Sequence, residues 1–230
     1  MKFEPLGDSA VVATMGSGID EATMATVLDF TDAVTSANRA GIMDVVPAYA
    51  TVTVFYNPHD FPDPSGDSYQ AVCRFIESCV GRPSNAPFHM EAKLVEIPVF
   101  YGGDHGPDMN VVCEHSGLSP DEVITMHYTA QYRVHAIGFT PGFPYLGGLP
   151  EKLRTPRRDT PRAHVPAGSV AIGGSQTGVY PVDSPGGWQI IGRTPMALFR
   201  PQEKRASRLW PGDRVRFMPI TKEEFVSWRS

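Results

Sequence analysis

The chain has 230 residues, of which 41% are hydrophobic and 20% charged, and this balance is typical of a folded globular protein. No apolar run approaches the roughly 20 residues of a membrane-spanning helix, and the N-terminus lacks the apolar segment of a signal peptide. We therefore expect a cytoplasmic protein of one or two domains, and the net charge of −5 without a known binding motif argues against nucleic acid as a partner.

Residues 1–86 predict a small α/β domain. Their apolar periodicity indicates the order strand, helix, strand, strand, helix. We expect the strands over 10–14, 43–47 and 51–56, and the helices over 20–38 and 68–80. With a further strand near 93–101, this order resembles a ferredoxin-like α+β layer. Residues 81–87, GRPSNAP, are expected to be a linker.

Residues 87–230 predict a mainly β domain. After the strand near 93–101, two helices are expected over 108–116 and 120–129, the second opened by a Ser119–Glu122 capping box. Residues 138–195 then hold 11 glycines and 9 prolines, which break the chain into short strands and indicate a closed β-barrel or a sandwich. We expect the short strands over 132–139, 169–172, 178–182, 189–191, 197–199 and 214–218, followed by a C-terminal helix over 221–228.

Charge is divided unevenly between these regions. Residues 1–96 carry 5 Lys and Arg against 13 Asp and Glu, whereas residues 97–230 carry 15 against 12. Within residues 151–216 the count is 12 against 5. This division suggests two regions that face different partners.

The segment GFTPGFPYLGGLP, residues 138–150, combines glycines, prolines and aromatic rings. This composition fits neither a helix nor a plain strand, so we predict a shaped loop. The segment RTPRRDTPR, residues 154–162, follows it and carries four arginines held extended by Pro156 and Pro161. A guanidinium group binds carboxylate or phosphate bidentately, which favours an anion or partner site. The alternative is a solvated loop with internal ion pairs.

Two further glycine-rich turns lie downstream. The segment Gly173 to Gly178, GGSQTG, resembles a phosphate loop but lacks its Lys and following Ser or Thr, so we exclude ATP binding by that mechanism. Anion binding by its backbone and a simple hairpin turn stay equal alternatives. Trp188, after Ser-Pro-Gly-Gly, either lines a pocket with Phe143 and Tyr145 or fills the barrel core, the safer interpretation for the ring.

The sequence shows no metal motif and no readable catalytic motif. The seven histidines form no H-E-x-x-H pattern, and the three cysteines lack metal-ligand spacing, so we expect no metal site and reduced, mostly buried thiols. No nucleophile frame of the G-x-S-x-G type is present, and the catalytic residues stay unknown. His127 and His164 are the histidines of greatest interest, although either fits a structural role equally well.

Five segments of the chain resemble the allophanate hydrolase subunit 1 family. They are residues 5–16, 45–58, 97–109, 118–195 and 210–217, so the resemblance covers nearly the whole chain. The long Gly/Pro pattern is specific to the family but does not separate its members. The family includes B subunits of bacterial ATP-dependent 5-oxoprolinases and the sporulation-kinase inhibitor KipI, and a related segment forms half of the carboxyltransferase domain of urea carboxylase.

The resemblance implies a cyclophilin-like β-barrel after the small α/β domain. It also implies a complex with a homologous barrel subunit of the 5-oxoprolinase C type and a third subunit of the A type. That complex uses ATP to open the lactam of 5-oxoproline to L-glutamate, so we expect an enzyme subunit that is inactive alone and binds no cofactor through a motif of its own. The alternatives are a KipI-like inhibitor of a sensor histidine kinase and a subunit of the allophanate hydrolase or urea carboxylase type.

The expected substrate- or partner-binding residues match the family's motifs, together with His164 beside the arginines. They are Phe139, Pro141, Gly142, Phe143, Tyr145, Arg157, Arg158, Arg162, His164, Gly174, Gln176, Thr177, Tyr180, Ser184, Gly186, Gly187 and Trp188. The sequence departs from the family at Thr140, where a larger apolar residue is expected. We predict that residues 138–188 form a preformed cationic cleft wall that another subunit completes.

Overall fold

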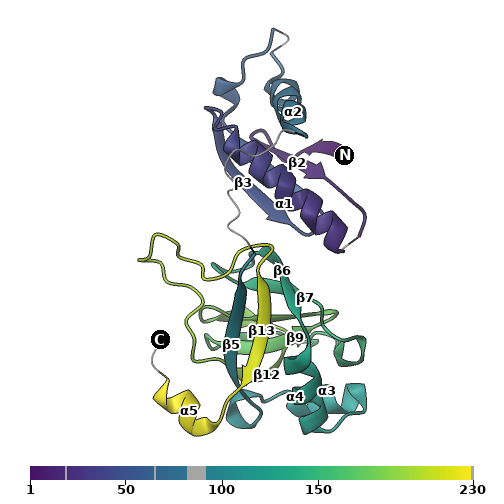
Figure 1. Ribbon diagram of the computed structural model, residues 1–230, viewed down its shortest axis with the longest axis vertical. Helices are drawn as coiled ribbons and strands as arrows, with labels where there is room; N and C mark the ends of the chain where they lie inside the picture. The colour runs from purple at the N-terminus through teal and green to yellow at the C-terminus, as the bar shows by residue number, and fades with distance from the viewer. Residues whose placement is uncertain (19, 65, 82–91, 229–230) are drawn as a thin grey trace. The chain divides into compact units, whose positions relative to one another are not determined.

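The structure is a computed structural model that describes residues 1–18, 20–64, 66–81 and 92–228. The chain divides into two compact units, Met1–Ala92 and Lys93–Ser230 (Figure 1). The expected domain boundary after residue 86 and all of the expected linker over 81–87 except Gly81 lie outside the described residues. In the described part of the chain, no helix combines the length and the apolarity needed to cross a membrane.

The described residues of the first unit form a four-stranded antiparallel sheet, in the order β1-β2-β4-β3, and two α-helices. Asp20 begins the first helix by accepting a hydrogen bond from the Thr23 amide at 2.8 Å, as an N-cap residue does. The elements are β1 Lys2–Pro5, β2 Ala10–Thr14, α1 Glu21–Ser36, β3 Ile42–Ala48, β4 Thr51–Tyr56 and α2 Ser68–Cys79.

The core of the first unit follows from simple periodicity. Val52, Val54 and Tyr56 alternate along β4 and are buried, and they pack with apolar residues of α1 and α2 in one cluster. The strand near 93–101 does not join this sheet, so that part of the expectation is wrong. β1 lies at the sheet edge beside β2 instead, and its mostly exposed residues gave no strand pattern in the sequence. The ferredoxin-like assignment stays a prediction.

The second unit contains a closed barrel of seven strands, in the order β10-β7-β6-β13-β5-β12-β9, which confirms the predicted mainly β domain. The barrel is mixed, because β13 runs parallel to β5 while the other pairs are antiparallel. Two short strands, β8 and β11, form a separate pair. The strands are β5 Leu94–Tyr101, β6 Tyr132–Ile137, β7 Pro144–Gly147, β8 Arg162–Val165, β9 Ser169–Gly173, β10 Gln176–Val179, β11 Ser184–Gly186, β12 Gln189–Arg193 and β13 Arg214–Pro219.

The described residues of this unit form three α-helices: α3 Met109–Ser116, α4 Pro120–Thr129 and α5 Lys222–Ser227. Both predicted capping boxes are present, at the starts of α4 and α5. Val112 of α3 and Val123 of α4 join the main barrel core. These two helices therefore pack against the same hydrophobic core as the strands.

The barrel wall carries an apolar cluster on each of its two faces. On β9, Val170 and Ile172 belong to the main core, whereas Ala171 belongs to a second cluster with Ile190 and several aromatic rings. Successive side chains of a strand point to opposite faces. The second cluster therefore lies on the face of β9 that is turned away from the main core.

Two local expectations for this unit are wrong. Residues 144–147, inside the predicted shaped loop, form strand β7, which pairs with β6 and β10. Pro144 is the first residue of the strand, where proline is tolerated, and Leu146 is fully buried in the core. The strand expected over 197–199 is absent, and Phe199 makes only an isolated bridge to Ser207.

Candidate functional site

The site begins at a tight loop between β6 and β7. The Gly138 amide donates to the Phe143 carbonyl at 3.0 Å, and the Phe143 amide donates to the Thr140 carbonyl at 3.0 Å. Gly142, at φ 80°, packs against the Phe199 side chain, where a Cβ atom would lie 3.1 Å from it. The chain's own contacts therefore define the shape of this loop.

Four rings form what we call the aromatic wall: Phe143, Tyr145, Tyr180 and Trp188. The Phe143 ring centroid lies 5.0 Å from Tyr145, 5.2 Å from Tyr180 and 5.4 Å from Trp188, and each pair is arranged edge to face. Phe143, Tyr180 and Trp188 are buried, whereas Tyr145 is half-buried. Trp188 is buried, as the core-filling interpretation expected, but it lies in the second cluster and not in the main barrel core. Tyr145 is the ring of this wall that reaches solvent.

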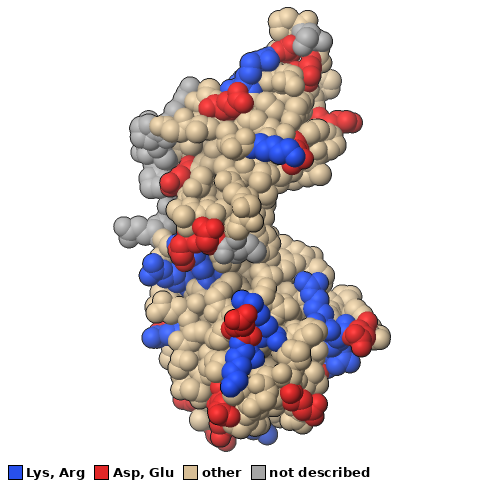
Figure 2. Space-filling model, turned by 90° about the vertical axis from the view of Figure 1, so that its right-hand side faces the viewer, with Lys and Arg blue, Asp and Glu red and all other residues tan. Residues whose placement is uncertain are grey.

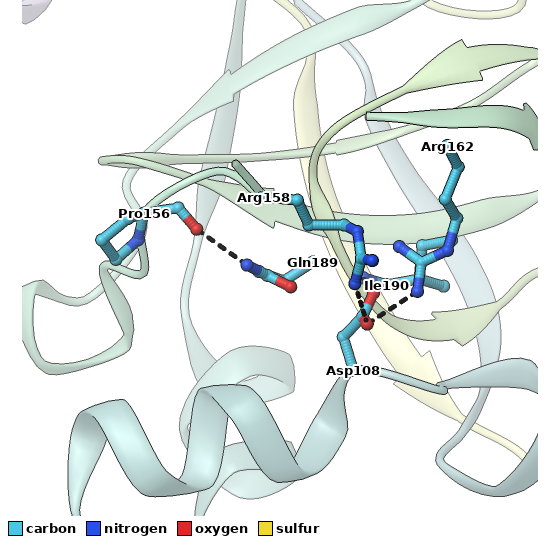
Figure 3. A network of polar contacts seen from close by, with 6 residues as sticks. All are labelled: Asp108, Pro156, Arg158, Arg162, Gln189 and Ile190. Carbon is cyan, nitrogen blue, oxygen red and sulfur yellow. Dashed lines mark hydrogen bonds and ion pairs between the residues drawn. The ribbon is translucent and has the colours of Figure 1, made fainter. Parts of the chain in front are cut away.

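Arg158 and Arg162 meet at a single carboxylate. Arg158 Nη1 lies 3.2 Å and Arg162 Nη2 lies 2.7 Å from Oδ1 of Asp108 (Figure 3). The other carboxylate oxygen, Oδ2, accepts from the Ile190 amide at 2.7 Å. Asp108 is only 3% exposed, so its carboxylate is a buried anion. Two guanidinium groups and one backbone amide supply its hydrogen bonds.

Sequence reasoning missed Asp108. In the sequence it lies only at the start of an expected helix, and in the structure it precedes α3 without making a capping hydrogen bond through its side chain. The carboxylate instead contacts arginines 50 and 54 residues further along the chain. The one available signal was an acidic residue near a helix start together with an arginine-rich segment that needed counter-charge.

The arginine pair retains hydrogen-bonding capacity. Within the described residues, no carboxylate other than that of Asp108 contacts either guanidinium group, so two positive charges face one negative charge. The arginine side chains are 35% and 24% exposed, while Arg158 Nε, Arg162 Nη1 and the Ser184 hydroxyl are buried without a partner. One positive charge and several donors are therefore left for an anionic acceptor.

Arg157 connects the arginine pair to the aromatic wall. Its guanidinium carbon lies 5.6 Å from the Trp188 ring centroid, a cation–π contact. The Arg158 amide also donates to the Gly187 carbonyl at 2.7 Å, which fixes the arginine segment beside the turn before Trp188. Burial raises the pKa of the Tyr180 hydroxyl, and Arg157 and Arg162 act in the opposite direction. The arginines and the wall thus form one region.

Positive charge is not confined to this region. On the face of the second unit drawn in Figure 2, Lys and Arg side chains occur in several groups with Asp and Glu side chains among them. The candidate site is therefore distinguished by the shared Asp108 and the unpaired donors rather than by a continuous basic surface.

Several other predicted site residues make contacts of their own within the chain. His164 pairs with Asp183 at 3.2 Å, and both side chains are exposed. Thr177 is buried, and its hydroxyl contacts His127 Nε2 at 3.0 Å and donates to the Ala171 carbonyl. Gly186 packs against the Tyr180 ring. Phe139 and Pro141 are exposed at the tip of the loop between β6 and β7.

The Gly173 to Gly178 segment is a hairpin turn. Gln176 pairs with Gly173, which leaves Gly174 and Ser175 as a two-residue loop between β9 and β10. The Gly174 amide donates to the Thr155 carbonyl at 2.8 Å, so it is not available to an anion. The segment therefore forms the expected hairpin, and anion binding by its other backbone amides stays a prediction.

The three cysteines are free thiols. Cys73 and Cys79 are buried and Cys113 is half-buried. Over the residues that the structure describes, no three His, Cys, Asp or Glu side chains come together as a metal site would require.

The fold and the arginine region define a protein of two units whose mixed β-barrel carries a positively charged cluster beside an aromatic wall. Residues 1–209 match the family model of the carboxyltransferase domain, subdomains C and D, and the chain belongs to this family. It is 39% identical to the B subunit of 5-oxoprolinase from Bacillus subtilis, over 99% of this chain and 96% of that one. It is 46% identical to the B subunit of 5-oxoprolinase from Escherichia coli O157:H7, over 77% of this chain and 78% of the relative.

A solved structure shares the fold. The crystal structure of TTHA0988 superposes with a TM-score of 0.78 at 37% identity, over 92% of this chain. Only 40% of that longer protein is matched, so this chain corresponds to a part of it.

Proposed function

We propose that this chain is the B-type subunit of an ATP-dependent 5-oxoprolinase, which hydrolyses 5-oxo-L-proline to L-glutamate. The similarity to a B subunit of 5-oxoprolinase over nearly the full chain supports this assignment. The structural observation that carries it is the pair of guanidinium groups that share one buried carboxylate, because this pair leaves a single positive charge for a substrate carboxylate.

The chemistry of 5-oxo-L-proline suits this region. The molecule is a small ring with one carboxylate and one cyclic amide, so it carries one negative charge. Arg158 and Arg162 would bind the carboxylate, and the half-buried Tyr145 offers a ring face on which the lactam ring packs. A bound carboxylate would neutralise the positive charge that Asp108 leaves on the Arg158 and Arg162 pair.

Other parts of the reaction belong to other subunits. The Gly173 to Gly178 hairpin has no lysine and its Gly174 amide is occupied, so we assign ATP binding to a partner. The complex would contain a homologous barrel subunit of the C type and a third subunit of the A type. We further propose that the chain is cytoplasmic and inactive alone.

The direct test is reconstitution. The chain is co-expressed with its C-type and A-type partners, and ATP hydrolysis that depends on 5-oxoproline is measured with and without this chain. We expect turnover only when all the subunits are present. Full turnover without this chain would refute the assignment.

A further inference from the structure

Arg157 differs from the other arginines of segment 154–162. The other three each pair with a carboxylate, whereas within the described residues no ion pair involves Arg157. Its side chain is exposed, and its guanidinium carbon lies 5.6 Å from the Trp188 ring centroid. A guanidinium group carries only N–H donors, and a contact with a ring face leaves these donors available. Arg157 therefore presents an uncompensated charge with free donors beside the aromatic wall.

Two hydrogen bonds fix the backbone on either side of Arg157. The Pro156 carbonyl accepts from Gln189 Nε2 at 3.0 Å (Figure 3). The Arg158 amide donates to the Gly187 carbonyl at 2.7 Å. Gly187 and Gln189 flank the tryptophan of the aromatic wall, so the segment runs against the turn that carries this ring. The chain's own contacts thus define where the Arg157 side chain begins, and a residue held in this way loses less freedom on binding.

Contacts of the aromatic wall relate Arg157 to the rest of the candidate site. The Trp188 ring has the Arg157 guanidinium on one side and Tyr145 as a ring neighbour, with centroids 6.0 Å apart. Burial raises the pKa of the Tyr180 hydroxyl, and the charges of Arg157 and Arg162 both oppose this shift, so both guanidinium groups lie near the same hydroxyl. Arg157 therefore belongs to the same site as the carboxylate-binding pair and the exposed ring face.

The proposed substrate has a second acceptor to which no residue has yet been assigned. In 5-oxo-L-proline the carboxylate and the lactam carbonyl are attached to the two ring carbons that flank the nitrogen, so both groups project from the same edge of the ring. An amide carbonyl oxygen that leaves water without gaining a donor costs free energy. With the carboxylate on Arg158 and Arg162 and the ring on Tyr145, a further donor beside these groups is needed. Arg157 is that donor.

We propose that Arg157 binds the lactam carbonyl oxygen of 5-oxo-L-proline and thereby selects the lactam over other ring carboxylates. The inference rests on the proposed function, because it assigns the second polar group of the same substrate. A hydrogen bond from a charged donor discriminates against a ring that lacks its acceptor, since the donor is then left unpaired.

The same charge discriminates against L-proline. This amino acid has the same ring and carboxylate, but it lacks the carbonyl and its ring nitrogen is a protonated ammonium group at neutral pH. The positive charge of Arg157 repels that ammonium group. Arg157 therefore favours the lactam by attraction and rejects the amine by repulsion, which together give specificity.

The test measures the binding of three ring carboxylates by calorimetric titration into the complex of all three subunits, without ATP so that no turnover occurs. The ligands are 5-oxo-L-proline, L-proline and cyclopentanecarboxylate, whose ring is neutral and has no carbonyl. Arg157→Met removes the charge and the donors while keeping an unbranched side chain against Trp188. Arg154→Met is the matched control, since Arg154 is exposed and pairs with Glu151 in the same segment. The thermal midpoint of each variant checks that it is folded.

We expect Arg157→Met to lower the ratio of the affinities for 5-oxo-L-proline and L-proline about 10-fold or more, with the affinity for cyclopentanecarboxylate unchanged. Arg157→Lys keeps a charge and should retain a higher ratio than Arg157→Met. Arg158→Gln should weaken all three ligands alike, because each carries the carboxylate, and Arg154→Met should change none. General damage to the site would lower all the affinities together and leave the ratio as it was.

Several results would overturn the role of Arg157. They are an unchanged ratio in Arg157→Met, an equal loss for cyclopentanecarboxylate, and a wild-type complex that binds none of the ligands. A raised KM for ATP with an unchanged ratio would assign Arg157 to the nucleotide and also overturn the proposal.

The inference and the proposed function fail in different ways. If the wild-type complex hydrolyses ATP in response to 5-oxoproline but Arg157→Met keeps the ratio, the carbonyl contact is wrong and the proposed function stands. If the ratio falls as expected but the wild-type complex shows no turnover, the proposed reaction is wrong and the carbonyl contact stands.

Discussion

Asp108 holds together three segments that are far apart in the sequence. Asp108 lies at the start of α3. Its carboxylate accepts hydrogen bonds from Arg158 and Arg162 of the arginine segment and from the backbone amide of Ile190 on β12. Removing one partner of a buried ion pair leaves uncompensated charge, which costs more than the pair itself contributes.

The substitution Asp108→Asn tests this role. It removes the negative charge at nearly constant volume and leaves two partly buried guanidinium groups unpaired. We expect a loss of about 2–3 kcal/mol in the free energy of unfolding. This is less than the loss on breaking a fully buried ion pair, because the arginines are partly exposed. Urea denaturation measures the loss, with the exposed Asp159→Asn in the same segment as control. A loss under about 0.5 kcal/mol would contradict the assigned role.

His127 is buried and neutral inside the barrel, and its contacts define its tautomer. The Thr177 hydroxyl donates to the Ala171 carbonyl, so it accepts from Nε2–H of His127 at 3.0 Å. Nδ1 therefore accepts from the Tyr101 hydroxyl at 2.8 Å. Burial lowers the pKa of His127 to about 3, because the imidazolium would lose its hydration inside the barrel.

This histidine predicts acid sensitivity. Its folded-state pKa lies below the roughly 6.5 of the unfolded chain, so the unfolded state binds the proton first. The stabilising contribution is complete above pH 6.5 and falls as the pH drops toward 3, by about 2 kcal/mol between pH 6.5 and pH 5. Urea denaturation at several pH values measures the slope, and His127→Gln should flatten it. Burial also lowers the pKa of His135, so a smaller slope should remain in the variant. Equal slopes in the two proteins would contradict the argument.

At the level of elements, the glycines of β9 and β10 explain how the aromatic wall packs. A Cβ atom on Gly173 would lie 2.5 Å from the Trp188 ring, and one on Gly178 would lie 2.9 Å from Phe143. The rings therefore pack directly against strand backbone. Rings of the protein itself therefore occupy the space that these two glycines leave open.

The substitution Gly173→Ala should disturb the wall. The added methyl group would overlap the Trp188 ring, which is buried and cannot move outward freely. We expect a loss of about 1–3 kcal/mol in the free energy of unfolding and a change in tryptophan fluorescence. Gly138→Ala is the control, since no atom lies within 4 Å of a Cβ atom there and its φ is not positive. If both variants behaved alike, the packing explanation would be wrong.

Elements with a clear local signal were predictable from the sequence. The strand over 51–56 and the start of α4 at Pro120 agree with the structure, because alternation and capping are local properties. Strands β7, β8 and β11 were missed, since they contain or adjoin prolines and are only three or four residues long. The arginine segment was found from composition, but its counter-charge Asp108 was not, since no local pattern encodes a contact across 50 residues.

At the scale of the whole molecule, each unit has a hydrophobic core of its own, and the candidate site lies within the second unit. The site is incomplete as a catalyst: it offers positive charge, donors and a ring face, but the sequence and the described structure identify no nucleophile or phosphate-binding loop in it. This agrees with a subunit that contributes substrate binding to a larger enzyme, which is the central claim of the account.

The measurement that tests this claim most directly compares two substrates in the reconstituted complex. 5-Oxoproline carries the carboxylate, and 5-oxoprolinamide replaces it with a neutral amide. We predict that Arg158→Gln and Arg162→Gln each raise the KM for 5-oxoproline roughly 10- to 100-fold and leave the KM for the amide nearly unchanged, because only the carboxylate uses the guanidinium charge. Arg154→Gln, at an exposed ion pair with Glu151, should change neither value. Equal changes for both substrates, or no change for either, would contradict the account.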